Sequence, residues 1–487
     1  MAIPKLCGIE NEFGFSVFDA AGKQLGSDGY LEAAHRFVAY FLAHEKAIRY
    51  DPAKESRRRD TDGDDEEESE TLFERTHRRL TESLTTGTDG FLANGARFYL
   101  DAHHPEYSTP ECLTPLELVA HDKASELVML EAAHLFSRQL AGNRHRIFVH
   151  KNNSDGNGHS YGCHLNVLLK RELVSGNFKY LVKQYIPFQI SRIILIGGGK
   201  LGAENNRPVC QFQISQRADF FEKLVSQNTV ENRPIFNTRD EPHADPKKYF
   251  RLHDISTDSL VCEQAIFLKA ALSQVVLAMI EDGFLKDNVL PKNPAEAMAR
   301  VSRDLSFKDG LLLETGKKMT GLEILRHYLT QSKKYLAEHP MSDQHILAVD
   351  QALGLLNQLE ENPLATAGKL DWTTAWKIAE SRPAQAKQNL LAFREIYPRG
   401  YYRELVKRGK ICRLVSDEEI ARAKLSPSIN TRAYLRSEMI KKFGLTIRDM
   451  SWSLFSVKIG QRLKVLEADN PLLAKAEADM LLSNLEI

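Results

Sequence analysis

"NGARFYLDAHHPEYSTPE", residues 94–111, changes character halfway along its length. The first half alternates as a β-strand does, with apolar side chains on one face and Arg97, Tyr99 and Asp101 on the other. Four more ionisable residues follow within a short span: His103, His104, Glu106 and Glu111. Buried unpaired carboxylates are costly, so such a group of acids indicates a bound cation, a substrate or a catalytic proton.

A second pair of acids occurs near the N-terminus, in "GIENEFG", residues 8–14. Glu10 and Glu12 are one residue apart, so on a strand they share a face, while Ile9 and Phe13 lie on the other face and Asn11 interrupts it. Such a pair is typical either of a solvated face or of a site where carboxylates hold a divalent cation. Mg²⁺ uses a few carboxylates together with phosphate oxygens and water.

Further polar groups recur downstream. "SYGCHLNV", residues 160–167, places His164 on one strand face. "NTRDEPHAD", residues 237–245, contains Arg239 and His243, and "SQRAD" contains Arg217. Arginines in such positions suit phosphate or carboxylate binding.

Known motifs narrow the chemistry. "GGGKLG", residues 197–202, does not match a Walker A loop, and the chain has no CxxC or HExxH zinc pattern and no GxSxG elbow. The residues therefore indicate a sheet lined with carboxylates that binds Mg²⁺ and a phosphate ligand. ATP-dependent activation of a carboxylate and metal-assisted hydrolysis of an amide both fit.

Composition excludes several classes of protein. The formal net charge is zero, which argues against a general nucleic-acid binder. No apolar stretch has the length of a membrane helix, and we expect no membrane partner. Six scattered cysteines without a CxxC pair favour a reduced, cytoplasmic protein with buried, inert thiols.

Periodicity predicts an α+β fold around a mostly antiparallel sheet. Strands are expected at 6–18, 94–101 and 211–222, and around residues 146–153 and 161–169, where a turn joins two of them. Helices are expected at 29–48, 116–141 and 261–283, and from residue 285 onward helices dominate. Residues 51–80 hold a block of acids and almost no core-forming side chains, which predicts a mobile loop. A boundary is expected near residue 400, dividing a domain at 1–400 from a small domain at 401–487.

These segments resemble the signature motifs of the Pup ligase and Pup deamidase/depupylase family. The resemblance rests on "GIENEFG", "NGARFYLDAHHPEYSTPEC", "QISQRAD", "NTRDEPHADPKKYFRLH" and "NTRAYLRSEMI", which occur in the family's order. It implies a glutamine synthetase-like catalytic domain with a curved antiparallel sheet, a small C-terminal domain, and ATP and Mg²⁺ as cofactors. It also implies that the partner is Pup, a small protein modifier ending in Gln or Glu, and its conjugates.

The resemblance also implies roles for particular residues. Asp101 matches the family's catalytic aspartate, and Arg217 and Arg239 match arginines near the phosphates. The implied metal ligands fall into two groups, the first being Glu10, Tyr99 and Glu106 and the second Glu12, His164 and His243.

Three activities remain open within this resemblance. The charged insertion at 51–80 and "NTRAYLRSEMIKKFG" favour the hydrolase, which deamidates Pup and cleaves its isopeptide bonds. "GIENEFG" and "YGCH" are closer to the ligase. Leu165 stands where the family usually has Glu, which would also suit a divergent relative acting on another Glu- or Gln-bearing substrate. The non-enzyme alternative is a scaffold that binds Pup-like peptides without turnover, and the presence of Glu10, Tyr99, Asp101, Glu106 and His243 argues against it.

Overall fold

The computed structural model describes residues 1–19, 21–50, 87–140, 146–156, 158–229, 232–397 and 400–486. Its centre is a seven-stranded antiparallel sheet in the order β13-β8-β1-β6-β5-β4-β3. The strands of this sheet are β1 (Cys7–Glu12), β3 (Ile48–Arg49), β4 (Asp89–Phe91), β5 (Arg97–Asp101), β6 (His104–Ser108), β8 (Cys163–Lys170) and β13 (Tyr249–Asp254). The α+β class with a mostly antiparallel sheet, predicted from the sequence, is confirmed.

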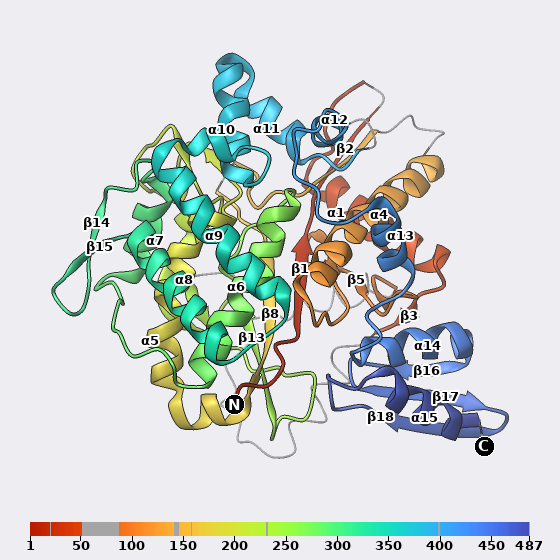
Figure 1. Ribbon diagram of the computed structural model, residues 1–487. Helices are drawn as coiled ribbons and strands as arrows, with labels where there is room; N and C mark the ends of the chain where they lie inside the picture. The colour runs from red at the N-terminus through yellow and green to blue at the C-terminus, as the bar shows by residue number, and fades with distance from the viewer. Residues whose placement is uncertain are drawn as a thin grey trace, which may run out of the picture.

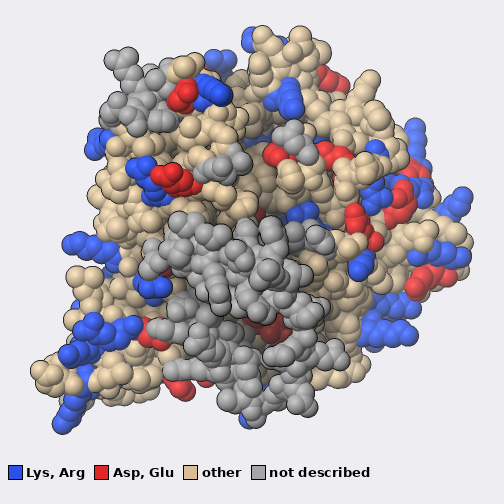
Figure 2. Space-filling model, turned by 180° about the vertical axis from the view of Figure 1, so that it is seen from behind, with Lys and Arg blue, Asp and Glu red and all other residues tan. Residues whose placement is uncertain are grey.

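Helices pack on one face of this sheet, the face toward the viewer in Figure 1, and Figure 2 shows the molecule from the opposite side. They are α1 (Ser27–His44), α4 (Pro115–Gln139), α5 (Arg171–Ile196), α6 (Glu263–Glu281), α7 (Pro294–Arg303), α8 (Gly321–Glu338), α9 (Asp343–Glu361), α10 (Asp371–Ser381), α11 (Ala386–Arg394), α12 (Tyr401–Lys407) and α13 (Asp417–Leu425). The start of α4 is fixed by a capping box, in which Thr114 and Glu117 each accept the other's backbone N–H. Within the described residues, α6 alone is long and apolar enough to cross a membrane, and it is wholly buried inside the molecule.

Several short sheets lie outside the central sheet. A two-stranded antiparallel sheet joins β2 (Gly14–Phe18) to β7 (Arg146–His150), and a parallel pair joins β11 (Phe221–Ser226) to β12 (Arg233–Asn237). Two smaller antiparallel pairs are β9 (Lys200–Leu201) with β10 (Phe212–Gln213), and β14 (Gly310–Leu312) with β15 (Lys318–Thr320).

The two faces of the central sheet differ in chemistry. On one face, Ile9, Leu165 and Leu252 join the apolar core formed with α5 and α6. Phe98 and Tyr107 belong to a second core with α1 and α4. Because side chains alternate along a strand, the polar neighbours of these residues all emerge on the opposite face. That face contains the candidate site.

The C-terminal segment forms a separate cluster at the β3 edge of the sheet, drawn in blue in Figure 1. It contains α14 (Ala433–Phe443), β16 (Ile447–Met450), β17 (Leu454–Ile459), β18 (Arg462–Glu467) and α15 (Lys475–Glu486). The main core still includes Tyr402 and Ile420, whereas the C-terminal core begins at Leu435 and also takes in Phe91 of β4. The boundary near residue 400 stays a prediction.

Several local expectations differ from the structure. Residues 211–222 do not form one strand: β10 covers only two residues, and a 3₁₀ turn at Ala218–Phe220 precedes β11. The strands β7 and β8 exist, but β7 pairs with β2 and β8 pairs with β1 and β13, so they do not form a hairpin. The expected loop at 51–80 lies outside the described residues.

Candidate active site

Strand register brings together acids and histidines that are far apart in the sequence. Glu10 of β1 lies directly opposite His164 of β8. On the other side of β1, Glu12 lies opposite Glu106 of β6, and Glu106 lies opposite Tyr99 of β5. Residues opposite one another on adjacent strands have close Cβ atoms, so the polar face gathers these groups into one site.

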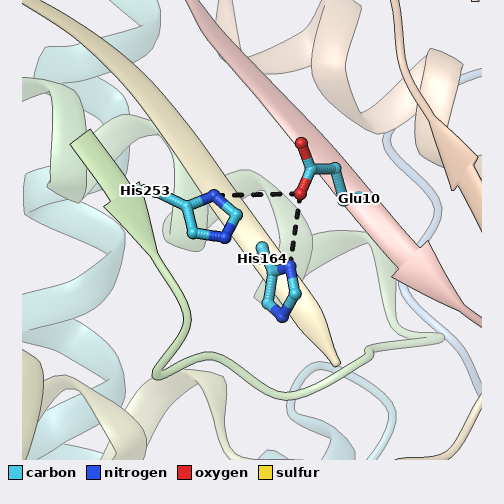
Figure 3. Close-up of side chains that lie close together, drawn as sticks. All are labelled: Glu10, His164 and His253. Carbon is cyan, nitrogen blue, oxygen red and sulfur yellow. Dashed lines mark hydrogen bonds and ion pairs between the residues drawn. The ribbon is translucent and has the colours of Figure 1, made fainter. Parts of the chain in front are cut away.

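The first cluster is centred on Glu10 (Figure 3). Its Oε2 lies 3.2 Å from Nδ1 of His164 and 3.8 Å from Nδ1 of His253, and its Oε1 lies 3.4 Å from a nitrogen of Arg251. Burial alone would raise the pKa of Glu10, but the hydrogen bond with His164 and the neighbouring cationic groups hold it well below its usual value. Burial lowers the pKa of His253, which leaves its imidazole neutral and able to act as a ligand.

The second cluster consists of carboxylates alone. One oxygen of each of Glu12, Asp101 and Glu106 lies within 4.8 Å of the others. Burial, followed by repulsion from Asp101, raises the pKa of both Glu12 and Glu106. The Oε2 atom of Glu106 is buried and has no hydrogen-bond partner in the part of the chain that the structure describes. Because a buried unpaired carboxylate is costly, this arrangement fits a cation that is shared by the three acids.

Asp101 differs from its two neighbours because it is exposed. It is the last residue of β5, opposite His104, at the tight turn into β6. Among the described residues, no hydrogen bond or ion pair engages its carboxylate, so its oxygens are available to a ligand. Tyr99, two residues earlier, is held by the guanidinium of Arg97, which lies 3.6 Å from its ring centroid, and its pKa is raised by burial.

Gly162 leaves the space in which the clusters meet. A Cβ atom on Gly162 would lie 2.3 Å from Nε2 of His164 and 2.4 Å from Oε1 of Glu12. A side chain at this position would displace His164 and Glu12, so glycine keeps this space free in the observed arrangement. The space lies between one imidazole nitrogen and one carboxylate oxygen, which is the donor set of a metal site.

Arginines lie on two sides of the clusters. Arg217 is buried and donates to the backbone carbonyls of Ile255 and Thr257, so its guanidinium supports the protein's own backbone. Arg233 donates to the carbonyl of Ser160 at 2.8 Å, and burial with the neighbouring Arg217 charge lowers its pKa to about 10. Arg239 is half exposed and pairs with Glu241 at 2.8 Å.

A mostly apolar cavity opens beside Glu10. It lies between the central sheet and the C-terminal unit, which runs from α14 to α15. It has about 600 Å³ of empty volume including open solvent. Glu10 and Arg251 line one side, and His243, Trp452 and Pro471 line another. An aromatic and aliphatic wall beside charged groups fits a nucleotide, whose base is flat and whose phosphates are anionic. His243 is tilted against Trp452, with the ring centroids 5.8 Å apart.

The remaining residues of the opening stretch have other contacts. His104 stacks on Tyr161 at 4.2 Å, and the backbone carbonyl of His103 accepts a hydrogen bond from Tyr30. Glu111 pairs with Arg432 at 2.9 Å and with Arg436, which ties the sheet to the C-terminal unit. Leu165 is fully buried in the main core, away from His164.

The structure therefore brings together Glu10, Glu12, Asp101, Glu106 and His164, with Tyr99 beside them. His253 is the imidazole placed next to Glu10 and His164, whereas His243 lines the cavity. Sequence reasoning missed His253, Arg251 and Gly162. The signal for two of them was present, because Arg251 and His253 alternate with apolar residues in "YFRLHD".

Comparison with known families identifies the chain. The family model described as "Pup-ligase protein" matches residues 5–456. The chain belongs to the Pup-ligase family.

Individual relatives carry two kinds of name. A depupylase of Acidothermus cellulolyticus is 35% identical over 92% of this chain and 90% of its own length. A Pup–protein ligase of Nocardioides sp. is 37% identical over 76% of this chain and 84% of its own length. The Pup deamidase/depupylase of Mycolicibacterium smegmatis is 35% identical over 76% of this chain and 75% of its own length.

Solved structures agree with the family assignment. The ligase PafA in its complex with Pup superposes with a TM-score of 0.81 at 27% identity, covering 99% of this chain and 92% of the other. PafA in complex with ADP gives a TM-score of 0.75 at 29% identity over 87% of this chain and 97% of the other. The fold of this chain is thus the fold of the Pup ligase.

Proposed function

We propose that this chain is an ATP- and Mg²⁺-dependent amidohydrolase of the Pup system. It hydrolyses the amide on the side chain of Pup's C-terminal residue, so that a terminal Gln becomes Glu and a Pup–lysine isopeptide bond is cleaved. The observation that carries the chemistry is the exposed Asp101 carboxylate, which has no hydrogen-bond or ion-pair partner among the described residues and is adjacent to Glu12 and Glu106.

Coverage does not separate hydrolase from ligase, because the deamidase/depupylase of M. smegmatis and the Nocardioides ligase both align over 76% of this chain. We prefer the hydrolase because of the charged insertion at 51–80 and the segment "NTRAYLRSEMIKKFG", and the depupylase of A. cellulolyticus, which aligns over 92% of this chain, is compatible with that choice. The ligase is the second candidate, because its relative is slightly more identical and because PafA with Pup has the same fold. A ligase would join the terminal glutamate of Pup to a lysine through a glutamyl phosphate.

Each group of site residues has a role in this proposal. Glu12 and Glu106 bind Mg²⁺, with Tyr99 beside them, and Glu10, His164 and His253 bind a second cation. A cation held by these residues would neutralise the carboxylates and supply Lewis-acid polarisation to an oxygen of the substrate or phosphate. Asp101 takes a proton from the water that attacks the amide carbonyl and passes it to the leaving nitrogen, so that the C–N bond breaks to give the Glu carboxylate and a lysine amine, or ammonia from Gln. Alternatively, Asp101 itself attacks the carbonyl, water protonates the leaving amine, and the resulting hydroxide hydrolyses the Asp101 anhydride. Arg239 and Arg251 face the anionic part of a nucleotide, and His243 and Trp452 contact its base.

The metal sites can be tested without activity. At a concentration of one hundred times its Kd, Mn²⁺ should add about 2.7 kcal/mol to the free energy of unfolding of the wild-type protein. Its unfolding temperature should rise accordingly. Glu106→Gln removes the unpaired carboxylate, so it should unfold at a higher temperature than wild type in EDTA and gain little from Mn²⁺. A wild-type level of stabilisation by Mn²⁺ in this variant would exclude Glu106 as a ligand.

The activity can be tested with two parallel reactions containing Mg²⁺-ATP. One contains a Pup–lysine conjugate, and the other contains Pup ending in Glu with an acceptor protein. Loss of the conjugate with little ADP formed supports the hydrolase. A new conjugate with stoichiometric ADP establishes the ligase instead, and no reaction in either tube contradicts both activities.

A cytoplasmic location belongs to the same proposal, since all six cysteines are free thiols.

A further inference from the structure

Asn11 lies on β1 between two candidate ligands, Glu10 and Glu12, but its side chain points to the opposite face of the sheet. The other residues of β1 on that face, Cys7 and Ile9, lie in the main core. Asn11 is 1% exposed and Asn is poorly suited to strands, so an apolar residue would pack here at lower cost. The polar side chain therefore needs an explanation other than packing.

The Asn11 side chain ties the strand to helix α4. Its Nδ2 donates to Oδ1 of Asp122 at 2.7 Å, and the other oxygen of Asp122 accepts a hydrogen bond from Lys151. Lys151 also pairs with Glu126 at 3.3 Å. Replacing a buried ion pair by apolar residues is often neutral or even stabilises a protein. The buried network around Asp122 and Lys151 is therefore not explained by a contribution to stability.

The same side chain is linked to the segment that contains Gly162. Its Oδ1 accepts from Oγ of Ser259 at 3.3 Å, and Ser259 also bonds Asn153. Asn153 in turn donates to the backbone carbonyl of Tyr161 at 3.1 Å, the residue before Gly162. One amide thus connects β1 both to the helix behind it and to the glycine that faces His164 and Glu12.

We propose that Asn11 is a positioning residue that sets cation affinity. Its hydrogen bonds lead to Asp122 on one side and, through Ser259, to Asn153 on the other. They fix the distance of the Glu10 and Glu12 carboxylates from the segment that contains Gly162. The inference rests on the proposed metal site. Hydrogen-bonded groups that orient ligands typically change metal affinity about 10–100-fold when removed.

The test is Mn²⁺ affinity measured by calorimetry, together with the unfolding temperature. Asn11→Leu keeps the size of the side chain but removes both hydrogen bonds, and it should weaken Mn²⁺ binding about tenfold or more. Val119→Ala is the matched control. Val119 is fully buried in α4, the helix that contains Asp122, and removing its methyl groups loosens the core without removing a hydrogen bond of the Asn11 network. It should bind Mn²⁺ within twofold of wild type at a comparable loss of stability.

A second pair of variants separates the hydrogen bond from the charge. Asp122→Asn keeps an oxygen that accepts from Asn11 and should stay within threefold of wild type, whereas Asp122→Leu should match Asn11→Leu. Should Asn11→Leu fail to fold, the double variant Asp122→Leu/Lys151→Met, which replaces the ion pair by apolar groups, takes its place with the same expected loss of affinity.

Three results would overturn the inference: Mn²⁺ affinity within twofold of wild type in Asn11→Leu, an equal loss in Val119→Ala, or an equal loss in Asp122→Asn and Asp122→Leu. Failure of the wild-type protein to bind Mn²⁺ would overturn the metal site and the inference together. If wild type binds Mn²⁺ but cleaves no Pup conjugate, the proposed function fails while the role of Asn11 is still decided by the affinities.

Discussion

The Nε2 atom of His164 lies 4.0 Å from Oε1 of Glu12, while Nδ1 of the same ring lies 3.2 Å from Glu10. A single imidazole therefore joins the two clusters of potential ligands. The distance of 4.0 Å is too long for a hydrogen bond and is suited to a small cation between the two atoms. Both atoms border the space that Gly162 leaves free.

Gly162→Ala should destroy this arrangement. The new methyl group would overlap both His164 and Glu12, which should cost about 1–3 kcal/mol of unfolding free energy and weaken Mn²⁺ binding at least tenfold. Calorimetry and a thermal melt measure both effects. Gly354→Ala is the control, because its Cβ meets nothing within 4 Å in helix α9, so it should be neutral or slightly stabilising. Normal Mn²⁺ binding by Gly162→Ala would mean that the space is not a ligand site.

Asp101→Asn should abolish turnover while nucleotide binding survives. The amide keeps the size of the side chain but can neither attack a carbonyl nor accept a proton, so we expect a loss of at least about 10³-fold in kcat. Removing the charge also relieves the repulsion that raises the pKa of Glu12 and Glu106, so the metal-free variant should melt at a higher temperature than wild type. Conjugate cleavage, binding of a fluorescent ADP analogue and a melt in EDTA test these points. Substantial residual turnover would contradict the role of Asp101.

The two arginines predicted near the phosphates should behave differently. Arg239→Ala should raise the KM for ATP about tenfold, or ~1.4 kcal/mol, with little change in stability, because its side chain is 49% exposed. Arg217→Ala should lower the free energy of unfolding by ~2 kcal/mol or more, because it leaves the buried carbonyls of Ile255 and Thr257 without a donor. Steady-state kinetics and denaturant melts distinguish them. The assignment of Arg239 fails if its variant binds ATP as wild type does.

Period-2 alternation was enough to predict which residues share a face. It placed Glu10 with Glu12 and predicted the polar face of β5, and the structure confirms both. Alternation says nothing about which strands pair or in which register, because that depends on packing between segments far apart in the chain. His253 was missed for this reason: only the pairing of β13 with β8 brings it beside Glu10 and His164.

Polarity was misleading where polar side chains are used inside the protein. Residues 211–222 were predicted to form one alternating strand, yet their polar residues Gln213, Ser215 and Arg217 are all buried. Their side chains bond the backbone carbonyls of Gly202 and Ile255 and the carboxylate of Asp258, which take the place of solvent. Leu165, at the position where the resemblance leads us to expect Glu, lies in the main core on the face opposite His164.

Glu111 links pH to the attachment of the C-terminal unit. Burial would raise its pKa, but the charges of Arg436 and Arg432 outweigh burial and lower the pKa to about 2. A carboxylate whose pKa is lower in the folded state stabilises the fold above its unfolded pKa of about 4.3, and this stabilisation is lost as the pH falls toward 2. The shift corresponds to about 3 kcal/mol.

Glu111→Gln should therefore lower stability at pH 7 and flatten its dependence on pH between about 4.5 and 2. Arg432 and Arg436 would then be buried without their carboxylate, so the C-terminal unit should loosen first, which hydrogen exchange in α14 and β16 would report. Glu438→Gln, in the helix α14 that contains Arg436, is the control. The ion pair of Glu438 with Lys441, at 3.2 Å, is partly exposed and should contribute less than about 1 kcal/mol to the free energy of unfolding. Equal pH dependence in Glu111→Gln and wild type would show that the tie between Glu111 and the two arginines does not hold the unit in place.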